Sequence, residues 1–497
     1  MAPVATTSTA PSVATSSAYD LTPKLAPFLD AHLLLMIMQS LKSEQIYPEE
    51  TITAEMVRVV RDRTELISFL QDLDPQNDHT DRLRASADRV VEEKKEIHPL
   101  LRHLEHLETV KEAGAEPTSG ESTDSSSGIL NCQSFKELEN MGVNRNHLEL
   151  YYKWCVSLWK AGIYDKSLEN LNHYQTLMTK IMVKDLEMSE QMGAELAEEK
   201  KKLNQRILSV KWGLLAGYLV KQENYPEAAQ QILSIDEFLE EATTMTKKEV
   251  LVQRTWLQHW MLFVLFKSGD LESTSINSAI TRVVELFLSE KYLALMSLMC
   301  PYLLRYAGGL FLMNKKLKGM LKDLVHVLAQ DRESYSDPLT DFLLALHQDM
   351  DFDRAKEALE ATQKLCASDY FLKNNLESIL SNARLSIFSI YCRIHESVDI
   401  GVIAEKMGLD PPRAEAWIVS LIQQGSLSNA CIDSDGKGNS SVFFPKEESD
   451  VYTQVVEKTN NVAFRLYLLQ VNADGIANKT GSKKVTKLAG EIAAQLS

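Results

Sequence analysis

Histidine and carboxylate side chains of the kind that bind zinc occur close together between His98 and His106. His103 and His106 are three residues apart, so a helix would place both imidazoles on one face beside Glu105. The same helix also carries an apolar stripe, formed by Leu100, Leu104 and Leu107. That stripe favours solvated or capping histidines over a metal site.

Other catalytic patterns are missing from the sequence. There is no Walker A loop, no G-x-G-x-x-G after a strand, no G-x-S-x-G, no H-E-x-x-H and no kinase signature. The six cysteines lie far apart without a C-x-x-C pair, which favours reduced thiols over zinc or a disulfide framework. The sequence therefore predicts a non-catalytic protein with no cofactor, no metal and no catalytic residue.

Side chains that could bind a partner lie near the C-terminus, on elements in the order of a winged helix. A long helix from Asn375 carries apolar residues at helical spacing, and a short helical segment, 403–409, follows. Asp410 is the expected N-cap of the next helix, whose apolar stripe is Ala414, Trp417, Ile418 and Leu421. Two strand-like runs, 427–432 and 440–444, flank a Gly-rich turn typical of a hairpin.

The charge of this winged helix argues against DNA binding. The expected recognition helix offers only Arg413, and residues 397–450 hold four basic against nine acidic side chains. Because phosphate neutralisation supplies much of the affinity for DNA, such a surface would be repelled by a duplex. We therefore expect a protein-docking module, and a winged-helix transcription regulator is disfavoured.

Two groups of apolar side chains are the candidate interface. Val442, Phe443 and Phe444 are expected on an edge hairpin, where they either contact a partner or cover the winged helix's own core. The second group has the three-and-four spacing of a coiled-coil seam and comprises Tyr452, Val455, Thr459, Val462, Leu466 and Leu469. An isolated helix this short is marginal in water, so the seam is expected to need partner helices.

Most of the remaining chain has the pattern of helical repeats. Three segments share one local design, in which an aromatic residue precedes a small residue by three and an aliphatic residue by seven; they begin at Leu158, Leu219 and Leu346. This design is tetratricopeptide-like, so we expect an all-α solenoid that ends in a winged helix and a C-terminal helix. Trp256 and Trp260, at i and i+4, are interpreted as solenoid core rather than a ligand cage.

Composition shifts divide the chain into six expected parts. These are a disordered leader at 1–18, an N-terminal helical region at 19–111, a flexible linker at 112–130, the solenoid at 131–374, the winged helix at 375–446, and a C-terminal helix and tail at 447–497. The formal net charge of −16 disfavours a general nucleic-acid surface. The longest apolar runs are far shorter than the roughly 20 residues of a membrane span, so no membrane association is expected.

A helical-repeat solenoid ending in an acidic winged helix resembles the PCI domain of the proteasome lid, the signalosome and eukaryotic translation initiation factor 3. Within that group the chain is most similar to the initiation-factor subunits. The blocks that carry the resemblance are Tyr19–Thr22, Phe28–His32, Gln253–Phe263, Met299–Tyr306, Asp349–Asp353, Asn382–Leu385, Tyr391–His395, Trp417–Leu421 and Gln454–Lys458. The chain departs from the family pattern in the leader, around 118–128 and around 184–202.

The resemblance implies a non-catalytic scaffold subunit of the cytoplasm. Its winged helix would dock beside those of other PCI subunits, and its C-terminal helix would join a shared bundle. The assembled factor would bind the small ribosomal subunit and other initiation factors, and would support recruitment of mRNA and initiator tRNA. A PCI subunit of the proteasome lid or signalosome is the alternative.

Overall fold

The computed structural model describes residues 19–75, 80–98, 100–101, 144–178, 194–221, 224–241, 245–269, 278–395, 397–407, 410–423, 431–434, 440–443 and 451–478. The expected leader and linker, 1–18 and 112–130, lie outside these residues. The chain divides into two compact units, Met1–Ile390 and Tyr391–Ser497.

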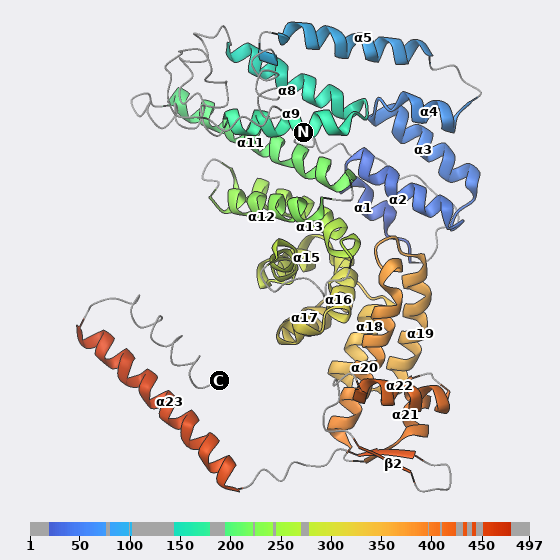
Figure 1. The fold of residues 1–497 in the computed structure, drawn as a ribbon, viewed down its shortest axis with the longest axis vertical. Helices are drawn as coiled ribbons and strands as arrows, with labels where there is room; N and C mark the ends of the chain where they lie inside the picture. The colour runs from blue at the N-terminus through green and yellow to red at the C-terminus, as the bar shows by residue number, and fades with distance from the viewer. Residues whose placement is uncertain are drawn as a thin grey trace, which may run out of the picture. The chain divides into compact units, whose positions relative to one another are not determined.

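The first unit is built from helices (Figure 1). Its N-terminal part comprises α1 (Thr22–Leu25), η1 (Ala26–Phe28), α2 (Ala31–Ser43), α3 (Glu49–Arg63), α4 (Ile67–Leu73) and α5 (Thr80–Glu96). The repeats follow as α8 (Arg145–Lys160), α9 (Tyr164–Leu177), α11 (Ala194–Lys221), α12 (Tyr225–Glu241), α13 (Lys247–Lys267), α14 (Ala279–Phe287) and α15 (Glu290–Met299). The unit continues through η4 (Pro301–Leu303), α16 (Leu304–Met313), η5 (Lys315–Met320), α17 (Leu321–Gln330), α18 (Pro338–Leu344), η6 (Ala345–Asp349), α19 (Phe352–Ser368), η7 (Lys373–Asn375) and α20 (Leu376–Ile394), which crosses the boundary.

Local side chains fix where several helices begin. Thr246 and Glu249 form a capping box at the start of α13. The Thr246 hydroxyl accepts a hydrogen bond from the Glu249 amide, and the Glu249 carboxylate accepts one from the Thr246 amide. Asp337 caps α18 by accepting from the amides of Leu339 and Thr340, both at 3.0 Å. These bonds satisfy amides that the first turn of a helix leaves without partners.

The repeat design expected from sequence is confirmed by burial. The aromatic residue of each copy begins the second helix of a pair, at Tyr164 of α9, Tyr225 of α12 and Phe352 of α19. The small residue three positions later is fully buried in each copy, at Ser167, Ala228 and Ala355. Successive helices can therefore approach closely, α8 against α9, α9 against α11 and α11 against α12 (Figure 1).

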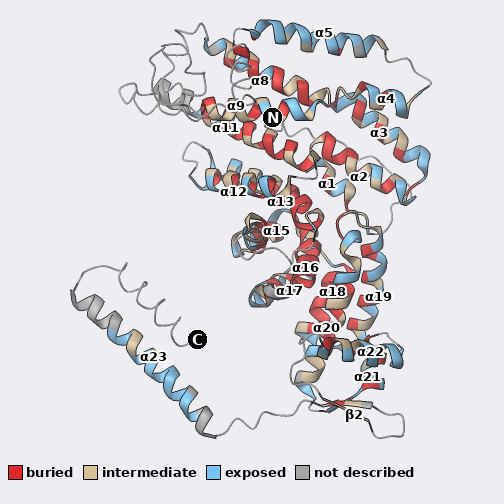
Figure 2. Cartoon of the chain, viewed as in Figure 1, coloured by how far each residue is buried: buried red, intermediate tan, exposed pale blue. Residues whose placement is uncertain are grey.

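The core follows the inner faces of the repeats, where the buried residues of Figure 2 lie. Helix α13 is buried on every side from Leu257 to Phe266, including Trp260, whereas Trp256 is half-buried. The interpretation of this pair as solenoid core is thus confirmed for Trp260. No helix in the described residues has the length and apolar character needed to cross a membrane.

The second unit contains a small sheet and two helices, followed by a long helix. Its elements are β1 (Ser397–Asp399), α21 (Ile400–Met407), α22 (Pro411–Gln423), β2 (Cys431–Ser434), β3 (Ser440–Phe443) and α23 (Val451–Asn478). The strand order is β1-β3-β2 with antiparallel pairing throughout, and Val442 lies opposite both Val398 and Ile432. Helix, helix and hairpin follow in the order of a winged helix.

Candidate protein-interaction site

The inner face of α22 holds the winged helix together. Ala414, Ile418 and Leu421 recur at helical spacing and are buried. Trp417 was grouped with this stripe in the sequence, but its side chain is only half-buried. A tryptophan is long enough to reach from the border of the stripe into solvent, so periodicity alone did not fix its depth.

The outer face of α22 lacks the charge that DNA requires. Arg413, its one basic residue, is 80% exposed and lies 4.0 Å from the Asp410 carboxylate. Ala416 and Val419 are exposed on the same helix. The exposed positions of α22 thus include small and apolar side chains and the acidic Glu415, and its single guanidinium has an acidic neighbour.

The hairpin strand predicted as an edge is the centre of the sheet. Because β1 pairs with β3 on the side away from β2, the backbone of β3 is paired on both sides. The side chain of Val442 is fully buried. The edge expectation is therefore wrong for this strand, and Val442 serves the winged helix's own core. The side chains of Phe443 and Phe444 lie outside the described residues.

The second candidate group lies along α23 and is exposed. Val455, Val462, Leu466 and Leu469 are 55%, 55%, 61% and 65% exposed. The side chain of Tyr452 is not among those described, although its backbone is helical. Four large aliphatic side chains at seam spacing thus face solvent on one 28-residue helix.

Apolar residues also extend around α23 beyond that seam. From Val462 to Leu469 the only charged residue is Arg465, and Phe464, Tyr467 and Leu468 are half-buried. A helix that is apolar on nearly all sides is one that partners surround. This segment therefore fits the interior of a helical bundle better than a two-stranded coiled coil.

Most of the histidine cluster lies outside the described residues. His98 is exposed, and His103, Glu105 and His106 lie outside the described residues. Within the described ranges, no group of three His, Cys, Asp or Glu side chains could hold a metal ion.

Sequence reasoning missed a buried polar cluster in the first unit. Arg305 of α16, which is 2% exposed, donates from Nε to Asp337 at 2.8 Å and from Nη1 to Asp369 at 3.2 Å. Tyr335 donates to Asp337 at 2.6 Å and Tyr306 to Asp369 at 3.1 Å. The only signal in the sequence is one arginine inside the apolar run from Leu303 to Phe311.

The electrostatics of this cluster follow from one cation between two buried carboxylates. Burial alone would lower the pKa of Arg305, but its acidic neighbours, Asp337 first, raise the pKa above the ordinary value and keep the guanidinium charged. Burial raises the pKa of Asp369, and the opposing effect of Arg305 is smaller. Burial likewise raises the pKa of Tyr306, so its hydroxyl remains a donor.

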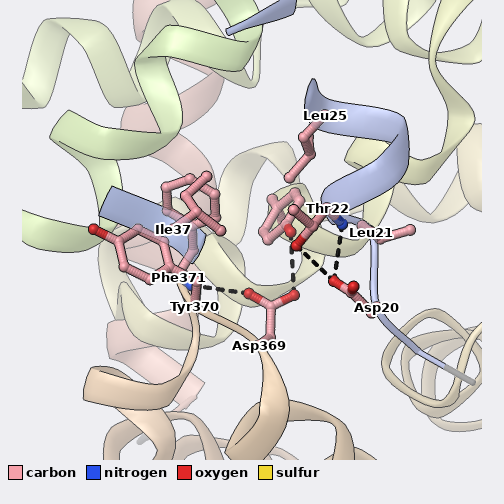
Figure 3. Close-up of a pocket in the computed structure, with 9 residues that line it drawn as sticks. Asp20, Leu21, Thr22, Leu25, Ile37, Asp369, Tyr370 and Phe371 are labelled. Carbon is pink, nitrogen blue, oxygen red and sulfur yellow. Dashed lines mark hydrogen bonds between the residues drawn. The ribbon is translucent and has the colours of Figure 1, made fainter. Parts of the chain in front are cut away.

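A small cavity beside the cluster has no room for a ligand (Figure 3). Its volume of about 10 Å³ is at the lower limit for one water molecule. It is lined by Asp20, Leu21, Thr22, Leu25, Ile37, Tyr306, Asp369, Tyr370 and Phe371. The cluster and its cavity lie where segments distant in the sequence pack together.

Comparison with known proteins gives two matches to family models. Residues 20–155 match the eIF3 subunit 6 N terminal domain, and residues 359–437 match the PCI domain. Together with the helical repeats and the winged helix, the second match shows that the chain carries a PCI domain. The fold predicted from sequence, an all-α solenoid ending in a winged-helix PCI domain and a C-terminal helix, is confirmed.

Over nearly its whole length the chain is similar to the E subunit of eukaryotic translation initiation factor 3. It is 28% identical over 462 residues to the E subunit from Arabidopsis thaliana, covering 91% of this chain and 95% of the relative. It is 29% identical over 464 residues to the Bombyx mori protein and 28% over 454 residues to the Caenorhabditis elegans protein, each covering 90% of this chain. These matches cover 94% and 95% of the two relatives.

Proposed function

We propose that this chain is a non-catalytic scaffold subunit of eukaryotic translation initiation factor 3, which works in the cytoplasm. The relatives named above carry the assignment to this factor, and they favour it over the proteasome lid or the signalosome. In the assembled factor the chain would contact other PCI subunits, the small ribosomal subunit and other initiation factors. It would support recruitment of mRNA and initiator tRNA without chemistry of its own.

The single observation that carries a scaffold role is the apolar surface of α23. Burying a large aliphatic side chain contributes about 1.5–3 kcal/mol, so four exposed ones represent a substantial unused driving force for association. Val455, Val462, Leu466 and Leu469 have the spacing that lets partner helices cover them together. The proposed occupants are C-terminal helices of neighbouring subunits, joined in one bundle.

The winged helix is proposed as the second docking element. Its docking edge cannot be β3, as the sequence had suggested. Since β3 is central, the strands that pair on only one side within the described residues are β1 and β2. A neighbouring PCI subunit would extend the sheet there through backbone hydrogen bonds. We also propose the boundaries 375–446 for the winged helix and 447–497 for the C-terminal helix together with the tail.

Charge placed on the α23 seam tests the scaffold role. The variant Leu466→Lys with Leu469→Glu should lose most recovery of partner subunits, because the bundle would have to bury two charges in place of two aliphatic side chains. The matched control, Asn460→Lys with Asn461→Glu, places the same charges at exposed positions beside the seam and should assemble normally. Equal recovery of partners by the two variants would exclude α23 as a docking helix.

A further inference from the structure

The N-terminal segment Tyr19–Leu29, here called the clasp, is bound by residues more than 200 positions later in the sequence. The indole Nε1 of Trp260 donates to the Phe28 carbonyl oxygen at 2.9 Å, and Arg305 Nη1 donates to that of Tyr19 at 2.7 Å. The Tyr302 hydroxyl lies 3.2 Å from the Lys24 carbonyl oxygen. Side chains of α13, η4 and α16 thus contact the clasp backbone along its length.

The clasp side chains fit the same surface. Leu21, Leu25 and Leu29 lie at i, i+4 and i+8 and are each no more than 5% exposed. The ring of Phe28 stacks on His259 with 4.1 Å between ring centroids and an interplanar angle of 14°. Figure 3 shows the clasp residues beside the Asp369–Phe371 loop. The clasp thus presents an apolar face, an aromatic ring and two backbone carbonyls that accept hydrogen bonds from Trp260 and Arg305. These are features by which a groove recognises a short peptide.

The clasp has little structure of its own. Asp20 starts α1 by accepting from the Thr22 amide and hydroxyl, at 2.9 and 2.7 Å, and α1 and η1 are only four and three residues long. Helices this short are not stable alone, so the clasp's order comes from the surface that it covers. Neither Pro23 nor Lys24 is buried, and both face solvent.

We propose that the surface of α13, η4 and α16 is a peptide-binding groove whose resident ligand is the clasp, and that the clasp detaches while the helical repeats stay folded. The opened groove takes a segment of the same chemistry, a short helical turn with aliphatic residues four apart followed by an aromatic ring. This inference concerns an intramolecular site and is independent of the docking surfaces of the second unit. Short helices with little structure of their own open locally at lower free energy than long buried helices, which makes the clasp the part that opens first.

Limited trypsin digestion of the full chain tests whether the clasp detaches alone. Lys24 lies in the clasp and Arg254 in α13, so their cleavage rates separate opening of the clasp from unfolding of the repeats. Cleavage after Lys24 is expected to be at least tenfold faster than after Arg254. The variant Phe28→Ala should accelerate it a further tenfold and leave cleavage at Arg254 unchanged. Equal rates at the two sites would overturn the proposal.

Two further variants serve as a control for Phe28→Ala and as a milder substitution in the clasp. Phe238→Ala removes another half-buried phenylalanine, on α12, and should not change cleavage at Lys24. Asp20→Ala removes the turn that starts α1 and the hydrogen bond that Asp20 accepts from the Tyr47 hydroxyl. It leaves Phe28 in place, so it should accelerate cleavage at Lys24 less than Phe28→Ala does, and it replaces Phe28→Ala if the latter unfolds the chain. If Asp20→Ala accelerates cleavage at both sites alike, the clasp is part of the global folding unit and the proposal fails.

Binding in trans tests the groove itself. A fluorescent peptide of residues 18–30 should bind full-length Phe28→Ala saturably, and bind the unsubstituted chain at least tenfold more weakly. The difference is expected because a tethered intact clasp competes at high effective concentration. A peptide carrying the same Phe→Ala change should lose binding. Absence of binding to the Phe28→Ala chain, or equal binding to both chains, would contradict a peptide-binding groove.

Discussion

Protonation of His259 should destabilise the first unit as the pH falls. Its imidazole is fully buried; Nδ1 donates to the Thr255 carbonyl at 2.7 Å, and Nε2 lies 2.9 Å from the Tyr302 hydroxyl. Burial lowers the pKa of His259 from 6.5 to about 4, although the bond to Thr255 opposes the shift. The unfolded chain therefore binds a proton at a pH where the folded chain does not.

The sign and size of the effect follow from that difference in pKa. A base with a lower pKa in the folded chain contributes stability above pH 6.5 that is lost as the pH falls toward 4. Each pKa unit corresponds to about 1.4 kcal/mol, so the full loss is about 3 kcal/mol. Between pH 7 and pH 5 the expected loss is about 2 kcal/mol.

The assay is urea unfolding at pH 7 and pH 5 for the unsubstituted chain and His259→Gln. The variant has no titrating group at this position. Between pH 7 and pH 5 its free energy of unfolding should therefore decrease by about 2 kcal/mol less than that of the unsubstituted chain. His98→Gln removes an exposed imidazole and is the matched control, expected to keep the unsubstituted chain's pH dependence.

Equal pH dependence of the unsubstituted chain and His259→Gln would refute the reasoning. It would mean that the protonated imidazole is tolerated, with Nε2 donating to the Tyr302 hydroxyl, which then donates to the Lys24 carbonyl. Hydrogen bonding to the charged form would in that case offset the cost of its burial.

Four other substitutions probe the buried contacts. Arg305→Met should cost roughly 3–5 kcal/mol in thermal or urea unfolding, because two buried carboxylates lose their cation; a cost under about 1 kcal/mol would argue against a charged cluster. Ile418→Ala should destabilise the winged helix by about 2–5 kcal/mol and Trp417→Ala by less, since only Ile418 is fully buried; the reverse order in unfolding measurements would contradict this packing. Val442→Lys should unfold the winged helix, measured by hydrogen exchange of α22, because a charge would enter the centre of its core; normal protection would show that the strand is accessible.

Features set by local periodicity were predictable from the sequence. The repeats could be aligned because an aromatic residue, a small residue and an aliphatic residue recur within about two helical turns, as at Tyr164, Ser167 and Leu171. The stripe of α22 and the seam of α23 follow from the same kind of spacing. In each of these places the neighbours that decide the structure are close in sequence.

Features set by distant partners were not predictable. Strand β1 has three residues, and it is a strand only because Val398 pairs with Val442. The sequence did not predict β1, and without β1 the strand β3 was expected at the edge of the sheet. Arg305 likewise gave no sign of its role, because Asp337, Asp369 and the Tyr19 carbonyl approach it only through the fold.

Assembly through α23 is the central claim, and affinity purification from cells tests it most directly. The full-length chain and a chain ending at Asp450 are purified in parallel, and the co-purifying proteins are quantified by mass spectrometry. We predict that the full-length chain recovers other subunits of initiation factor 3 and that the shortened chain, still folded in its solenoid and winged helix, recovers far less of them. Equal recovery by the two chains, or enrichment of proteasome-lid or signalosome subunits instead, would contradict the account.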